Sequence, residues 1–118
     1  MIFLNWGIAL RRKSEAASAI EKYQKALAIN PHLALPHFNL GNVYYERDDF
    51  AQAILAYEKA VEFDPSLAVA HFALARAYIK SQQLQPAARA IKAGLQYDQT
   101  NNEAKVTLKQ LEDYLQTH

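Results

Sequence analysis

Cysteine is absent from this chain of 118 residues, and glycine and proline are scarce, at three and four residues. The lack of cysteine excludes disulfides, thiolate metal ligands and cysteine nucleophiles, and it favours a reducing compartment. The three glycines are isolated, so the chain has no glycine-rich loop to hold a phosphate. An excess of one charge is also lacking, since the net charge is +1, and this gives no reason to expect a nucleic acid as partner.

The N-terminal segment lacks the pattern of a targeting sequence. Its apolar residues precede the basic run Arg11–Lys13, whereas a secretory signal has the reverse order. The apolar stretch is about ten residues long, too short to span a bilayer. We therefore expect a cytoplasmic protein that does not enter a membrane, either complete or excised from a longer chain.

What the chain does have is an internal repeat of 34 residues. The stretch His37–Tyr45 returns as His71–Ile79 with His, Phe, Leu and Tyr in place. The same spacing relates Trp6, Leu40 and Leu74; Gly7, Gly41 and Ala75; Ala19, Ala53 and Ala87; Tyr23, Tyr57 and Ile91; and Ala26, Ala60 and Gly94. A fit this dense at one period predicts a stack of similar units.

Each unit reads as two helices, which the middle unit shows best. Apolar residues recur at helical spacing over residues 34–47 and again over 50–63. Asp49 is a good N-cap for the second helix, and Gln52 three residues later completes a capping box. Pro65 ends that helix, because the residue before a proline is displaced from the α region.

Small residues are expected where the helices approach each other most closely. Gly41 and Ala53 are predicted to lie at the closest approach of the two helices of one unit, and Ala60 at the closest approach to the next unit. A bulkier side chain at these places would overpack the contact at a cost of roughly 1–3 kcal/mol. Tyr44 and Tyr57 are predicted to fill the space between the helices.

This unit resembles the tetratricopeptide repeat, on the strength of Leu40, Gly41, Tyr44, Ala53, Tyr57, Ala60 and Pro65. The third unit departs from the pattern with Gly94 for alanine and Gln99 for proline, and the first has Leu10 for tyrosine. The resemblance implies an all-α, right-handed superhelical solenoid. Its parts would be three helix–turn–helix repeats, at about residues 1–33, 34–67 and 68–101, and a capping helix at 102–116.

The last helix is predicted to close the array. Thr100 and Glu103 suggest a capping box at its start. Lys109 and Glu112 occupy the places where a fourth repeat would have a small residue and a tyrosine. The helix therefore resembles the polar-faced cap that ends such a stack.

No comparable cap precedes the first unit, whose apolar residues begin at Met1. We expect either a longer array or two copies that meet at this end. Net charge also alternates along the chain, at +3 for residues 1–33, −4 for 34–67 and +3 for 68–101. A positive band of one molecule could pair with the negative band of a second copy that is displaced along the array. A self-associating scaffold is therefore the alternative function.

The family's characteristic function is to bind a peptide or protein segment in a concave groove lined by the first helix of each repeat. By the family's pattern, the groove-facing side chains are Leu4, Ile8, Leu35, Phe38, Asn39, Asn42, Tyr45, Val69, Phe72, Arg76, Ile79 and Lys80. This set predicts an apolar floor with amides and a basic excess. It suits a partner segment with apolar anchors and acidic ends.

Two interpretations of these groove residues stay open. In one, Phe38 and Phe72 hold an apolar side chain between them, and Arg76, near Asn39 and Asn42, holds a carbonyl or carboxylate. In the other, the two phenylalanines only shield the floor and the asparagines are ordinary residues of the repeat.

Some tetratricopeptide co-chaperones hold an acidic C-terminal tail with a clamp of lysine, asparagine and arginine side chains. The corresponding places here are Leu4, Ile8, Asn39, Val69 and Ala73. Only Asn39 matches, so the charge-assisted hydrogen bonds of that clamp are not expected.

No group of residues suggests catalysis, a cofactor or a metal. His37 and His71 lie one repeat apart, at places that usually hold a packing aromatic. Neighbouring helix axes at about 8–10 Å do not bring two such rings to one ion. Asp48 and Asp49 are predicted to form a turn and a cap. We therefore expect an interaction module without enzymatic activity.

Overall fold

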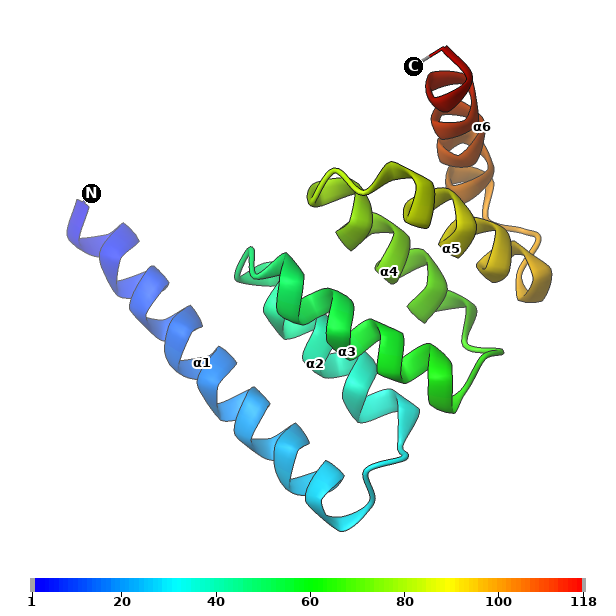
Figure 1. Cartoon of the computed structure of the whole chain (residues 1–118). Helices are drawn as coiled ribbons and strands as arrows, with labels where there is room; N and C mark the ends of the chain where they lie inside the picture. The colour runs from blue at the N-terminus through cyan, green and yellow to red at the C-terminus, as the bar shows by residue number, and fades with distance from the viewer. Residues whose placement is uncertain (1, 118) are drawn as a thin grey trace.

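The computed structural model describes the backbone of residues 2–117 and the side chains of Lys13 and residues 15–117. This part of the chain contains helices and no strands, and the helices follow one another as a stack (Figure 1). They are α1 (Ile2–Ile29), α2 (Ala34–Glu46), α3 (Phe50–Phe63), α4 (Ala68–Lys80), α5 (Leu84–Tyr97) and α6 (Asn102–Thr117). The predicted all-α repeat fold is confirmed.

Tight turns with the same backbone geometry form the α2–α3 and α4–α5 hairpins. Asp48 and Gln82, one repeat apart, adopt left-handed conformations with φ of 59° and 62°. The predicted cap of α3 is confirmed, since Asp49 Oδ1 accepts a hydrogen bond from Gln52 N at 3.3 Å. One repeated turn therefore folds each helix back on the one before it.

The first hairpin that the sequence predicts is not formed, because α1 is one continuous helix of 28 residues. The repeat register explains the difference. Ser14 occupies the place of the two left-handed turn residues, and Ala16 the place of Phe50 and Leu84. Residues 11–19 contain neither glycine nor proline and are mostly good helix formers. The local sequence therefore has nothing that ends the helix here.

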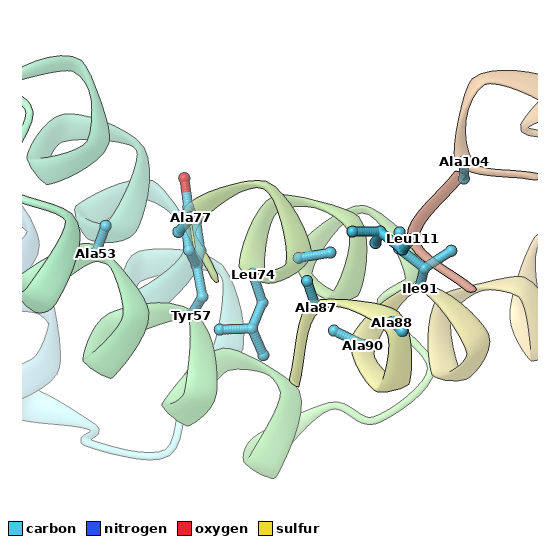
Figure 2. Close-up of a cluster of buried hydrophobic side chains, with 11 residues drawn as sticks. Ala53, Tyr57, Leu74, Ala77, Ala87, Ala88, Ala90, Ile91, Ala104 and Leu111 are labelled. Carbon is cyan, nitrogen blue, oxygen red and sulfur yellow. The ribbon is translucent and has the colours of Figure 1, made fainter. Parts of the chain in front are cut away.

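Alanine allows the helices to pack closely. Ala53 and Ala60 of α3 and Ala77 of α4 are completely buried. One hydrophobic cluster runs from Ala53 through α4 and α5 to Leu111 of α6, and Figure 2 shows Tyr57, Leu74 and Ile91 along it. The core is therefore continuous along the stack, as expected for units that cover one another.

Two glycines accommodate aromatic rings from the partner helix of their hairpin. A Cβ atom at Gly41 would overlap the ring of Tyr57, which confirms the predicted need for a small residue. A Cβ at Gly94 would lie 2.6 Å from Phe72 Cε1. Gly94 replaces the usual alanine because Phe72 needs that space.

The two repeated histidines form hydrogen bonds to the connections that precede α2 and α4. His37 Nε2 lies 3.0 Å from the carbonyl oxygen of Pro31, and His71 Nε2 lies 2.8 Å from that of Pro65. Both rings are buried, and each satisfies its Nε2–H by donating it to the proline carbonyl. The His71 ring also stacks on Tyr97, with centroids 6.2 Å apart. The histidines therefore have a packing function in this fold.

The start of α6 differs from its prediction. Asn101 is the capping residue, because its Oδ1 accepts a hydrogen bond from Ala104 N at 3.0 Å. Thr100 Oγ1 instead donates to Asp98 Oδ1, so the expected capping box of Thr100 and Glu103 is wrong. Asp98 forms a turn with Thr100 that orients the chain into α6.

Candidate functional site

A pocket of about 110 Å³ lies between α4, α5 and α6. Phe72, Ala75 and Ile79 of α4 and Ile91 of α5 give it apolar walls. The remaining lining residues are polar or belong to the start of α6; they are Arg76, Asn101, Glu103, Ala104 and Thr107. The site is therefore an apolar hollow with charged groups at its edge.

The pocket lies at a place where two residues change between the repeats. In the α2–α3 hairpin, the ring of Tyr57 fills the space beside Gly41. In the α4–α5 hairpin the same places hold Ile91 and Ala75, and both line the pocket. Isoleucine is shorter than tyrosine, so the outer part of the space remains open.

The same change releases Arg76. Its counterpart one repeat earlier, Asn42, accepts a hydrogen bond from the hydroxyl of Tyr57 at 2.5 Å through Oδ1. Ile91 has no hydroxyl, so an asparagine at position 76 would have no such partner. Asn42 is therefore held by its hydrogen bond to Tyr57, whereas Arg76 is exposed.

The charges at the site come from α4 and α6. Arg76 and Lys80 are exposed, and within the described side chains neither forms an ion pair. Burial raises the pKa of Tyr57 to about 12, and the nearby charge of Arg76 opposes that rise. Arg76 lies at the α4 edge of the pocket, and Glu103 lines it from the start of α6.

The predicted groove residues divide into three groups. The side chains of Leu4 and Ile8 lie outside the described residues. Those on α2 are the exposed Leu35 and the half-buried Phe38, Asn39, Asn42 and Tyr45. Those on α4 are the half-buried Phe72 and Ile79 and the exposed Val69, Arg76 and Lys80. The pocket brings Phe72, Arg76 and Ile79 together.

The two phenylalanines pack within their own hairpins. The Phe38 ring lies 5.8 Å from the Tyr57 ring, whereas Phe72 lies against Gly94. The difference is consistent with the change of Tyr57 to Ile91, since Phe72 has an isoleucine at the place where Phe38 has a tyrosine ring.

Sequence reasoning missed the part of the site that α6 provides. Thr107 lies one period after Ala73, and Ala104 one period after Ala70. The 34-residue register therefore places α6 where a further first helix would stand. Extending the register past residue 101 would have identified both residues as candidates, although α6 does not carry the complete repeat pattern.

A second hollow, of about 350 Å³, lies between α5 and α6. It is more open, and its lysine, Lys92, forms an ion pair with Glu112 at 3.4 Å.

Among the described residues, no three His, Cys, Asp or Glu side chains are grouped to hold a metal. Nor is any described helix both long and apolar enough to cross a membrane.

The stacked helical hairpins and the repeat register define a helical repeat protein. A model of the TPR repeat matches residues 7–48 and 41–82, which is more than half of the chain. The chain therefore belongs to the tetratricopeptide repeat (TPR) family. No curated protein sequence matches it.

Solved structures share the fold. MamA is 25% identical with a TM-score of 0.81, and the match covers 92% of this chain and 63% of MamA. The first TPR of Spaghetti (RPAP3), bound to the HSP90 peptide SRMEEVD, is 22% identical with a TM-score of 0.79, covering 94% of this chain and 88% of that one. YrrB, described as a TPR protein with an unusual peptide-binding site, is 24% identical with a TM-score of 0.72, covering 82% and 50%.

Proposed function

We propose that this chain is a non-catalytic interaction module of the cytoplasm that binds a peptide segment in a groove along α2, α4 and the start of α6. The observation that carries the proposal is the pocket, which combines apolar walls with a guanidinium at its edge that has no ion pair among the described side chains. Ligand sites characteristically join an apolar hollow to a few polar groups that fix orientation. Two proteins of similar fold support it, since the Spaghetti domain is bound to a peptide and YrrB has a peptide-binding site.

The ligand differs from the acidic tail that the co-chaperone clamp holds. On α4, the two clamp places carry the exposed Val69 and the half-buried Ala73, and neither is charged. The cations of α4 are instead Arg76 and Lys80. A carboxylate on this helix would therefore bind about two turns closer to the C-terminus of α4 than in the clamp.

A peptide-display selection tests the proposal. Random peptides are selected on the immobilised chain and then measured against Arg76→Glu and Arg89→Glu. Both arginines are exposed, but Arg89 lies on α5 away from the pocket. We expect the selected peptides to bind the Arg89 variant normally and to lose at least tenfold in affinity for the Arg76 variant. Equal binding to both variants, with unchanged helicity, would contradict a groove site at α4.

Self-association through α1 is a second candidate. Ala19, Tyr23 and Ala26 are half-buried, whereas their counterparts in α3 are at most 2% exposed. Ile29, near the end of α1, is 88% exposed. An open apolar face of this kind suits a contact between copies.

Sedimentation velocity over a range of concentrations distinguishes this candidate. If α1 mediates association, the mean mass rises with concentration, and Tyr23→Lys returns the chain to a monomer while the exposed Gln24→Lys does not. A constant monomer mass would remove the second candidate.

A further inference from the structure

We infer that the pocket between α4, α5 and α6 is a subsite for a branched aliphatic side chain of a peptide whose neighbouring residue is acidic. The inference rests on the proposed function and specifies its ligand. The aliphatic side chain enters beside Ala75 and Ile91, and the acidic side chain is held by Arg76 and Lys80. The following three observations support this assignment.

The first observation is the size and lining of the pocket. Its walls are formed by Phe72, Ala75, Ile79 and Ile91, and its volume is about 110 Å³. A cavity of about 150 Å³ with similar walls holds benzene. The smaller pocket therefore suits an isobutyl or sec-butyl group better than an aromatic ring. Burying such a group contributes most of the free energy expected from so small a contact.

The second observation is that the fold accepts a side chain in this space. One repeat earlier, the Tyr57 ring occupies the corresponding place between Gly41 and the neighbouring helices. The open space beside Ile91 is thus a place that a side chain fills elsewhere in the same protein. A peptide side chain from outside would restore the packing that the change to isoleucine removes.

The third observation is the polarity across the pocket. Arg76 and Lys80 stand four residues apart on one face of α4, so one carboxylate can reach both. Both are exposed, and neither is paired within the described side chains. On the opposite side, Glu103 of α6 repels a second acid. The acidic residue of the ligand therefore lies on the α4 side of the aliphatic residue.

The test uses short peptides in which each feature is changed alone. The probe is acetyl-Gly-Glu-Leu-Gly-amide, and its partners replace Leu by Ala or Glu by Lys. Titration followed by amide chemical shifts reports both affinity and location on the wild-type chain. We expect shifts at residues 72–80, 91 and 101–107. Replacing Leu by Ala should weaken binding at least about tenfold, because three buried carbon atoms are lost.

Two protein variants provide matched controls. The pair Ala75→Gly with Ile91→Tyr reproduces the Gly41 and Tyr57 arrangement, so it fills the pocket with a combination that this fold already contains. In this variant the preference for Leu over Ala should disappear. Arg76→Glu should reverse the preference for Glu over Lys and leave the preference for Leu intact.

The outcomes separate the subsite from the general function. If displayed peptides bind wild type and the filled-pocket variant equally, or if the shifts lie away from the pocket, the subsite is refuted while peptide binding stands. If neither the displayed nor the synthetic peptides bind, both proposals fail. Should the filled-pocket variant not fold, the shift map and the Leu-to-Ala comparison on wild type still decide the question.

Discussion

Replacing Gly41 by alanine tests the account of how the hairpins pack. The new Cβ would approach three atoms of the Tyr57 ring, the farthest of them at 2.9 Å. Tyr57 is only 2% exposed, so its ring has no free space to move into. Overpacking in a core costs about 1–3 kcal/mol, and this overlap belongs at the upper end. Alanine also gains about 1 kcal/mol over glycine in helix propensity. We therefore expect a net loss of about 2 kcal/mol.

The next hairpin provides the control, because it carries Ala75 and Ile91 at the same places. In a Tyr57→Ile background the new methyl group has room. The second substitution, Gly41→Ala, should then stabilise the chain by up to about 1 kcal/mol through helix propensity alone. The two substitutions should thus be coupled by about 3 kcal/mol, the difference between the two backgrounds.

Urea unfolding followed by circular dichroism gives the free energy of unfolding of the four proteins in this cycle. If Tyr57→Ile is too unstable to measure, the reverse cycle with Ala75→Gly and Ile91→Tyr tests the same coupling. Effects that add to within about 0.5 kcal/mol would refute the reasoning, because residues in contact should not behave independently.

Three further predictions concern single interactions. His71→Ala should cost about 1–3 kcal/mol in urea unfolding, because it removes a buried ring together with its hydrogen bond to the Pro65 carbonyl. Asp49→Ala should cost about 1 kcal/mol in the same assay, since the cap of α3 is lost, and an unchanged midpoint would contradict this. Burial raises the pKa values of Tyr57 and Tyr78 to about 12, above the usual 10. The folded state therefore holds these protons more tightly, and the stability they contribute is complete below pH 10 and is lost as pH rises from 10 through 12. Urea midpoints across that range should fall less for the two Tyr→Phe variants than for wild type.

The repeat register predicted most of the fold. Residue type and spacing predicted the paired helices of the second and third repeats, the Asp49 cap and the need for glycine at position 41. The first hairpin was the main error, because matches at Trp6 and Gly7 indicated a complete repeat. The missing turn was visible in Ser14 and Ala16, but only once the structure had shown which residues form the turn.

The candidate site was less accessible from the sequence. Three of the predicted groove residues, Phe72, Arg76 and Ile79, line one pocket, since residues three and four apart share a helix face. That they bind a peptide stays a prediction. The part formed by α6 was missed, and so was the link between Asn42 and Tyr57. Those contacts join residues far apart in the chain, whose distances depend on how the hairpins stack.

The sequence alone therefore determined the architecture, because a 34-residue period of small and large apolar residues can bury its surface only by stacking. The tertiary structure decided what the departures from that period mean. Gly94 makes room for the ring of Phe72, and Ile91 lines an open pocket at the place where Tyr57 fills the space one repeat earlier. The physical reason is that the effect of each substitution depends on the side chain across the helix interface, and the sequence alone does not show which one that is.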